Sequence, residues 1–140
     1  MNIIRKILLM LIILLIIFAG INFYLSNSGT CIIGDSNSCA NVQNSEYGEI
    51  LGIKVSLIGI IAFIFLFIVF VGAVKYGKYR DNFYEIFLIS VVIGCLASVY
   101  FISLQLFILK ATCVNCMIID STMLLVGVLT LIDYVEQKRR

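Results

Sequence analysis

Residues 7–25 read ILLMLIILLIIFAGINFYL, an apolar run long enough to cross a lipid bilayer as a helix. Three more runs of this kind follow, at about residues 55–74, 83–109 and 113–132. A bilayer core about 30 Å thick needs roughly 20 mostly apolar helical residues per crossing. The apolar residues are continuous rather than alternating, which is typical of membrane helices and not of half-buried strands. We therefore predict an all-α integral membrane protein, a four-transmembrane-helix bundle forming a single domain over residues 1–140.

The composition excludes most other classes of protein. Of the 140 residues, 62% are hydrophobic and 13% are charged, whereas a soluble domain has about 45–50% apolar and about 25% charged residues. The sequence contains no His, which excludes Ser-His-Asp and Cys-His nucleophiles and His-ligated metal sites. A net charge of +2 is too weak an excess of positive charge for a nucleic-acid partner.

The basic residues predict the orientation in the membrane. All of the ten Lys and Arg residues except Lys54 and Lys110 precede the first run, lie between the second and third, or follow the fourth. The positive-inside rule places that side in the cytoplasm, so we expect a multi-pass protein of the cell membrane with both termini cytoplasmic. Residues 26–54 then form an outer loop between the first two spans, with room for a short interfacial helix. The first run exceeds the usual 7–15 residues of a signal-peptide core, so we expect it to remain as a span.

Four of the five cysteines fall on the predicted outer side. Cys31 and Cys39 lie in the outer loop, and Cys113 and Cys116 form a CVNC motif where the fourth run begins. Disulfides persist on the extracytoplasmic side of a membrane, so both pairs are candidate redox pairs. Cys95 lies in the middle of the third run, where a lone thiol usually serves as a small hydrophobic side chain.

The position of the CVNC motif favours thiol chemistry. Thr112 is a plausible N-cap for the fourth helix, which would put Cys113 and Cys116 in its first turn. Unpaired N–H groups and the positive end of the helix dipole favour a thiolate there. Two alternatives remain open, a static structural disulfide and a four-Cys metal-binding or transport protein. The seven-residue spacing in the loop pair departs from the short-spaced pairs of structural zinc sites, and we predict no metal.

Two dithiols near one surface suggest a relay by thiol–disulfide exchange. The loop pair would meet a soluble partner, and the helix pair would deliver electrons to an acceptor in the membrane. The sequence offers neither a haem ligand set nor a nucleotide-binding motif. A lipid-soluble quinone (ubiquinone, menaquinone or a related compound) is therefore the most economical acceptor.

The ordered pattern resembles the vitamin K epoxide reductase family. The family has an outer-loop Cys pair, then span two, then a CxxC at the outer end of span four. Residues 39–48, CANVQNSEYG, are similar to its C-x-x-V-x-x-S-x-[WY]-G segment, and Gly52 and Gly59 match small residues leading into span two. A second bacterial family of four-helix, quinone-linked disulfide oxidases places its CxxC before the spaced pair, opposite to the order here.

The resemblance implies a role for each matching residue. Cys116 resembles the thiol that contacts the quinone, and Cys113 the thiol that exchanges with the loop. Cys39 resembles the loop cysteine that bonds to Cys113, and Cys31 is its mate on the partner side. Ser45 matches a serine placed near the bound quinone.

The chain also departs from other members of that family in two ways. Asp120 stands where vertebrate members have a tyrosine, four residues after the CxxC. It could bind a quinone carbonyl or pass protons, or it could be a neutral carboxyl bonded to Ser121, Gln105 or a backbone carbonyl. The chain matches a short prokaryotic form without the fused thioredoxin-like domain of many bacterial members, so the resemblance implies a separate extracytoplasmic thioredoxin-like partner.

Overall fold

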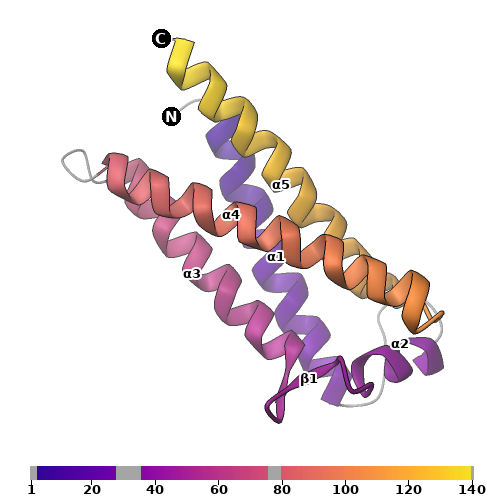
Figure 1. Ribbon diagram of the computed structural model, residues 1–140. Helices are drawn as coiled ribbons and strands as arrows, with labels where there is room; N and C mark the ends of the chain where they lie inside the picture. Colours follow the sequence, from indigo (N-terminus) through magenta and orange to yellow (C-terminus); the bar gives the residue numbers. More distant parts are fainter. Residues whose placement is uncertain (1–2, 28–35, 76–79, 140) are drawn as a thin grey trace.

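The computed structural model describes residues 3–27, 36–75 and 80–139. Four long helices dominate it (Figure 1): α1 (Ile3–Asn27), α3 (Val55–Lys75), α4 (Arg80–Ser103) and α5 (Val114–Arg139). A five-residue π-helical segment, η1 (Leu104–Ile108), continues α4. Between α1 and α3 lie a short helix, α2 (Ser36–Gln43), and a two-stranded hairpin, β1 (Glu49–Ile50) with β2 (Ile53–Lys54).

The four long helices confirm the predicted all-α membrane bundle. Each is long and apolar enough to cross a membrane, over Ile3–Leu25, Val55–Lys75, Asn82–Ile108 and Val114–Arg139. The last helix continues well past residue 132, where the apolar run ends, because the residues that follow include the good helix formers Glu, Gln, Lys and Arg. The short helix α2 occupies part of the predicted outer loop.

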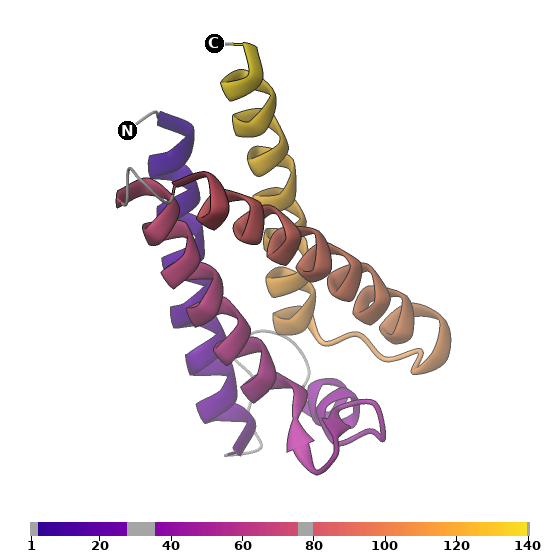
Figure 2. The same cartoon turned by 60° about the vertical axis from the view of Figure 1, so that its left-hand side comes forward.

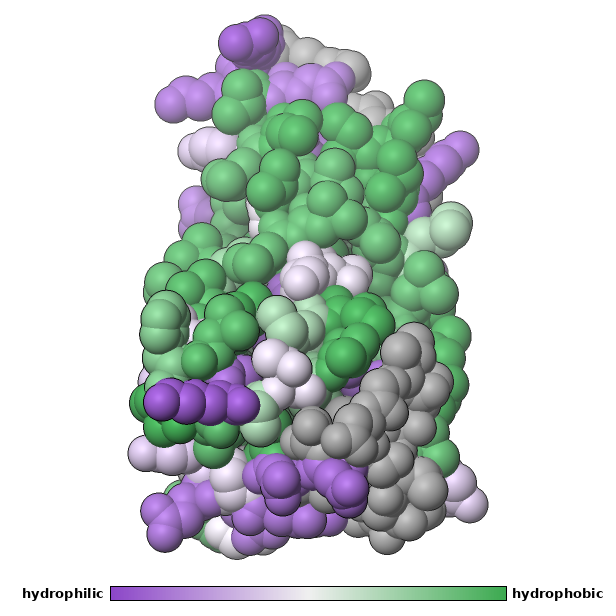
Figure 3. All heavy atoms as spheres, turned by 90° about the vertical axis from the view of Figure 1, so that its right-hand side faces the viewer, coloured by the Kyte–Doolittle hydropathy of each residue, from purple (hydrophilic) through white to green (hydrophobic). Residues whose placement is uncertain are grey.

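The helices form a ring in which each long helix packs against two others. α1 contacts α3 and α5, and α4 contacts the same two helices. Between 17% and 28% of the residues in each apolar window are buried, so most of the apolar surface faces outward. Figure 3 shows a broad hydrophobic band between two hydrophilic ends. A bundle that exposes such a band is suited to a lipid surround, in which apolar side chains are well solvated.

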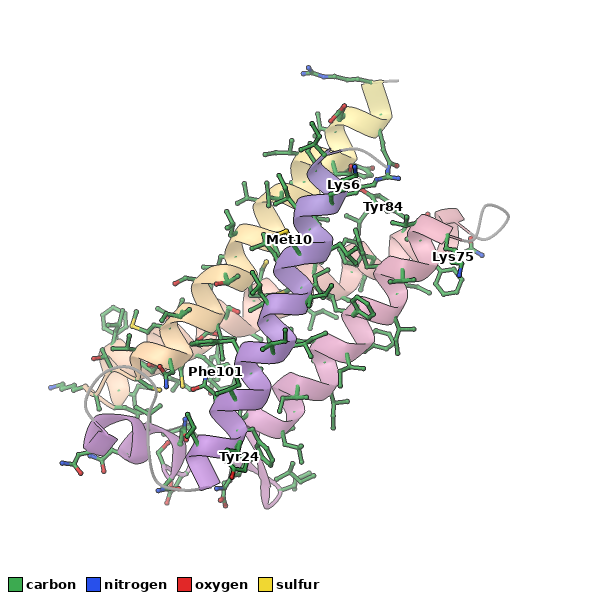
Figure 4. The ribbon with its side chains drawn as sticks, turned by 180° about the vertical axis from the view of Figure 1, so that it is seen from behind. Lys6, Met10, Tyr24, Lys75, Tyr84 and Phe101 are labelled. Atoms are coloured by element: carbon green, nitrogen blue, oxygen red, sulfur yellow. The ribbon has the colours of Figure 1, made fainter. Side chains whose placement is uncertain are left out.

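The two ends of the bundle differ in chemistry. The basic end holds both termini of the described chain and the side chains of Lys6, Lys75, Lys138 and Arg139, and the cysteine end holds α2, the hairpin and the CVNC motif. Figure 4 shows Lys6 and Lys75 near one end and Tyr24 at the other. The grouping of these basic residues agrees with the sidedness expected from the sequence.

The tightly packed core lies in the half of the bundle near the basic end. It is built from Leu8 and Ile12 of α1, Phe70 of α3, Phe87 of α4 and Val126 of α5, with their neighbours. The rings of Phe70 and Phe87 lie 5.1 Å apart between centroids. Toward the cysteine end α3 and α4 diverge, as Figures 1 and 2 show, so the core does not continue with the same density.

A buried polar cluster ties three helices together at the basic end. The Asp133 carboxylate of α5, only 2% exposed, accepts hydrogen bonds from Arg5 Nε of α1 at 3.3 Å and from Tyr84 Oη of α4 at 3.2 Å. Gln137 Nε2, one turn later on α5, donates to it at 3.3 Å. The cluster fixes the relative positions of α1, α4 and α5 where the protein is most compact.

Candidate active site

The CVNC motif caps the start of α5. The helix begins at Val114, and the Met117 N–H donates to the Cys113 carbonyl at 3.0 Å, so Cys113 itself is the N-cap. Its Sγ accepts the Cys116 N–H at 3.4 Å, the capping bond that a Ser or Thr oxygen usually makes. The expectation of Thr112 as the cap is therefore wrong by one residue. The two sulfurs lie 2.8 Å apart, with Cys116 Sγ donating to Cys113 Sγ.

The two cysteines of the motif face different surroundings. Cys113 is fully buried in a small cluster with Val42 of α2, packed by Leu109 and Ala111. Cys116 is half-buried and lines a cavity inside the bundle. Cys116 also packs against that cluster, but of the two cysteines only Cys116 lines the cavity.

The structure describes the side chains of two of the four predicted catalytic cysteines. The side chains of Cys113 and Cys116 are described and in contact. Cys39 lies in α2, three residues before Val42, and its side chain is outside the described part. Cys31 lies outside the described residues altogether. Since residues three apart share a helix face, the contact of Val42 with Cys113 puts the backbone at position 39 on the side of α2 that approaches the CVNC motif.

A cavity of about 320 Å³ opens beside Cys116, within the size range of small-molecule sites. This space is the cysteine cavity. Every helix contributes to its wall, and most of the lining is apolar; Phe101 of α4, labelled in Figure 4, is among the aromatic side chains. Its polar lining residues are Asn22, Gln43, Ser45, Tyr47, Lys54, Ser56, Ser98, Gln105, Cys116 and Asp120.

The structure places both further residues proposed from the sequence, Ser45 and Asp120, on this wall. The Ser45 hydroxyl donates to the Val42 carbonyl at 2.8 Å, which satisfies a carbonyl at the end of α2. Asp120 lies one turn after Cys116 and is hydrogen-bonded to Ser98 of α4. Ser98 is the partner, rather than the Ser121, Gln105 or backbone groups considered from the sequence.

Gln105 is a polar residue of the site that the sequence suggested only as a possible partner of Asp120. It lies in η1, is 3% exposed, and lines the cysteine cavity. Its Oε1 accepts the backbone N–H of Cys113 at 3.0 Å. The side chain thus joins the end of α4 to the N-cap of α5. A glutamine in an apolar run, seven residues after Ser98 and therefore on the same helix face, was the signal in the sequence.

Asn115, between the two cysteines, is fully buried, and neither Oδ1 nor Nδ2 has a hydrogen-bond partner within the part of the chain that the structure describes. Over the same residues, no group of three or more His, Cys, Asp or Glu side chains is arranged to hold a metal ion.

A four-span bundle with a cysteine pair between a short outer helix and an internal cavity defines a multi-pass membrane protein with a thiol–disulfide site. The sequence model of the vitamin K epoxide reductase family matches residues 6–131, nearly the whole chain. The chain belongs to the vitamin K epoxide reductase family and is a membrane thiol–disulfide oxidoreductase. The comparison with curated proteins gives no significant match.

Proposed function

We propose that this protein is a quinone-linked thiol oxidase that reoxidises a separate extracytoplasmic thioredoxin-like protein. One observation carries the proposal. The two CVNC sulfurs lie 2.8 Å apart, Cys113 is buried against Val42 of α2, and Cys116 lines the cavity. A pair placed in this way can take electrons from a protein loop and release them to a ligand in the membrane.

The electrons enter through the outer loop. The reduced partner attacks the Cys31–Cys39 disulfide, leaves with a disulfide of its own, and both loop cysteines become thiols. Cys39 then attacks Cys113 Sγ, the Cys113–Cys116 bond breaks, and Cys116 leaves as a thiolate beside the cysteine cavity. Cys31 attacks Cys39 in turn, which restores the loop disulfide and leaves Cys113 and Cys116 as a dithiol.

The cysteine cavity fits a quinone ring in size and chemistry. Its volume of about 320 Å³ and mainly apolar wall suit a flat ring, and Gln105 and Asp120 offer polar groups for the ring oxygens. A bound quinone accepts the two electrons and two protons of the Cys113–Cys116 dithiol, whose disulfide re-forms. Since the dithiol supplies both protons, the reaction balances without a further proton donor.

Small residues on α3 and α4 give the cavity a route to the lipid. Gly59, Ala62 and Ala97 all line it, and the two alanines are exposed on the surface of the bundle. A Cβ added at Gly59 would meet no atom within 4 Å. An opening at this depth lets a lipid-soluble quinone arrive sideways, without crossing the polar outer surface.

Asp120 is suited to move a proton between Cys116 and the ring. It lies one turn below Cys116 and lines the same cavity, and the hydroxyl of Ser98 holds its carboxyl group in place. A carboxyl within hydrogen-bonding reach of the reacting groups is a typical general acid–base catalyst.

The proposed orientation places α2 and the CVNC motif outside the cell membrane and both termini in the cytoplasm. The basic residues gathered at the opposite end of the bundle support this orientation. Only the outer side offers an oxidising compartment in which such disulfides persist.

Quinone reduction by purified protein supplied with a reduced thioredoxin-like dithiol tests the proposal. We expect activity to be lost when Cys31, Cys39, Cys113 or Cys116 is changed to Ala, and kept in Cys95→Ala. Cys95 is the matched control because its Sγ packs on α5, 3.7 Å from the Met123 carbonyl, away from the cavity wall. Activity that survives Cys116→Ala would refute the relay. Stoichiometric zinc together with no loss of thiols on adding quinone would instead favour the metal-binding alternative.

A further inference from the structure

We propose that Gln105 is a quinone-binding residue whose side-chain amide links the bound ring to the cysteine motif. Its oxygen is held by the backbone of Cys113, and its NH₂ group donates a hydrogen bond to a quinone carbonyl. The identity of the ligand rests on the proposed function, whereas the contact with Cys113 is part of the structure.

Gln105 lies at the start of the π-helical segment and continues the inward face of α4, because Ser98, Phe101 and Gln105 line the cavity at helical spacing. In η1 the Leu109 N–H donates to the Leu104 carbonyl, five residues back, at 2.9 Å. Leu104 and Gln105 are buried, while Leu106 and Phe107, the next residues, are exposed to the lipid side. Such segments occur frequently at functional sites, where one extra residue in a turn redirects the side chains.

The contact with Cys113 fixes which way the amide points. A backbone N–H can only donate, so the atom that faces Cys113 at 3.0 Å is the amide oxygen. The NH₂ group is then the part of the amide left for the cavity. The side chain is 3% exposed and lines the cavity, so the NH₂ group lies where a ligand in the cavity can accept from it.

A donor in this position has a clear use. The surrounding wall is mainly apolar, and a hydrogen bond is electrostatically stronger where water is excluded. Negative charge grows on the ring oxygens as electrons arrive from Cys116, so a fixed donor stabilises the charge as it develops. The same side chain holds the N-cap of α5, and this places the ring and the cysteine pair in a constant relative position.

The test measures binding without turnover. Purified protein with its cysteines oxidised is loaded with a short-chain ubiquinone carrying ¹³C at one carbonyl or the other, and the infrared carbonyl bands are recorded. We expect one carbonyl band to lie at lower frequency in the wild-type protein and to move back in Gln105→Met. We also expect the dissociation constant to rise about tenfold, the usual cost of one lost hydrogen bond at a buried polar group.

The matched control is Ser103→Ala, two residues earlier. The Ser103 hydroxyl bonds to the Val99 carbonyl and does not line the cavity, so neither the band nor the dissociation constant should change. A second variant, Gln105→Glu, keeps an oxygen for Cys113 while removing the NH₂ group. It should still alter the carbonyl band.

The outcomes separate the two proposals. If wild-type protein binds quinone and Gln105→Met gives the same carbonyl bands and dissociation constant as Ser103→Ala, the role of Gln105 is refuted while the proposed function stands. If wild-type protein binds no quinone, both are refuted. If Gln105→Met does not fold, Gln105→Asn replaces it, because the shorter amide cannot keep both contacts and the carbonyl band should still shift.

Discussion

Gly59 offers a way to separate quinone binding from thiol exchange. It lines the cysteine cavity, and a Cβ added there would meet no atom within 4 Å. A cavity that binds benzene has a volume of about 150 Å³, so the ring of Gly59→Phe would fill about half of the 320 Å³ available. The remaining space is then little more than that of one bare six-membered ring, so a quinone ring with its substituents and isoprenoid tail no longer fits beside Cys116.

The size of the effect follows from the atoms displaced. A benzoquinone ring has about eight heavy atoms, and drug-sized ligands gain about 0.3 kcal/mol per heavy atom. Excluding the ring therefore costs about 2.4 kcal/mol, a rise of about 60-fold in the KM for quinone. Exchange between Cys39 and Cys113 should keep its rate, because those sulfurs react on the α2 side of the motif.

The assay follows quinone absorbance at several quinone concentrations, and thiol trapping measures the exchange step in the absence of quinone. The matched control is Gly20→Phe in α1, where an added Cβ also meets open space but the residue does not line the cavity. An unchanged KM in folded Gly59→Phe would refute the placement of the quinone. A similar rise of the KM in Gly20→Phe would mean that the rise in Gly59→Phe reflects damage to the fold and not exclusion of the quinone ring.

Three further variants test other parts of the structure. Asp120→Asn keeps the shape of the side chain but removes its proton, so kcat should fall about 100-fold with little change in KM if the carboxyl acts as a general acid–base. Asp133→Asn leaves Arg5 without its charged partner and should lower the free energy of unfolding by about 1.5–3 kcal/mol in chemical denaturation, with a small effect on KM. Asn115→Leu replaces an amide that lacks partners among the described residues, and it should raise the free energy of unfolding by about 1–2 kcal/mol; a loss of stability would mean that the amide is used.

The sequence was sufficient for the spans and for the place of the CVNC motif at the end of the bundle opposite the basic residues. Continuous apolar runs decide where helices cross a bilayer, because an unpaired backbone cannot remain in lipid. The distribution of Lys and Arg then assigns each loop to one side of the membrane. With four crossings, the CVNC motif must lie at the end of the bundle opposite the basic residues. These inferences need only composition and length.

Details of a single residue or turn could not be predicted in this way. The N-cap falls on Cys113 rather than Thr112 because Gln105 accepts the Cys113 N–H and the sulfur serves as the capping acceptor. Ser98 meets Asp120 only because α4 and α5 pack with a particular rotation. Periodicity does not determine such rotations in helices that are apolar on every face.

The same limit explains why the contacts of Gln105 and Asp133 were not predicted. The sequence offered Gln105 as a possible partner of Asp120, whereas its Oε1 accepts the N–H of Cys113. Asp133 directly follows the last predicted span, which ends at residue 132, and it is 2% exposed and bonded to Arg5 and Tyr84. The contacts of Asp133 with Arg5 and Tyr84 join segments far apart in the sequence.

The central claim is that electrons pass from Cys39 to Cys113 and leave through Cys116. Peptide mapping of the purified Cys116→Ala variant under non-reducing conditions tests it most directly. In this variant Cys113, left without its mate, can attack the Cys31–Cys39 disulfide at Cys39 and release Cys31 as a thiol, but it cannot go on to form a Cys113–Cys116 disulfide. The account predicts a Cys39–Cys113 linkage with Cys31 left as a thiol. Recovery of Cys113 as a free thiol beside an intact Cys31–Cys39 disulfide would contradict it.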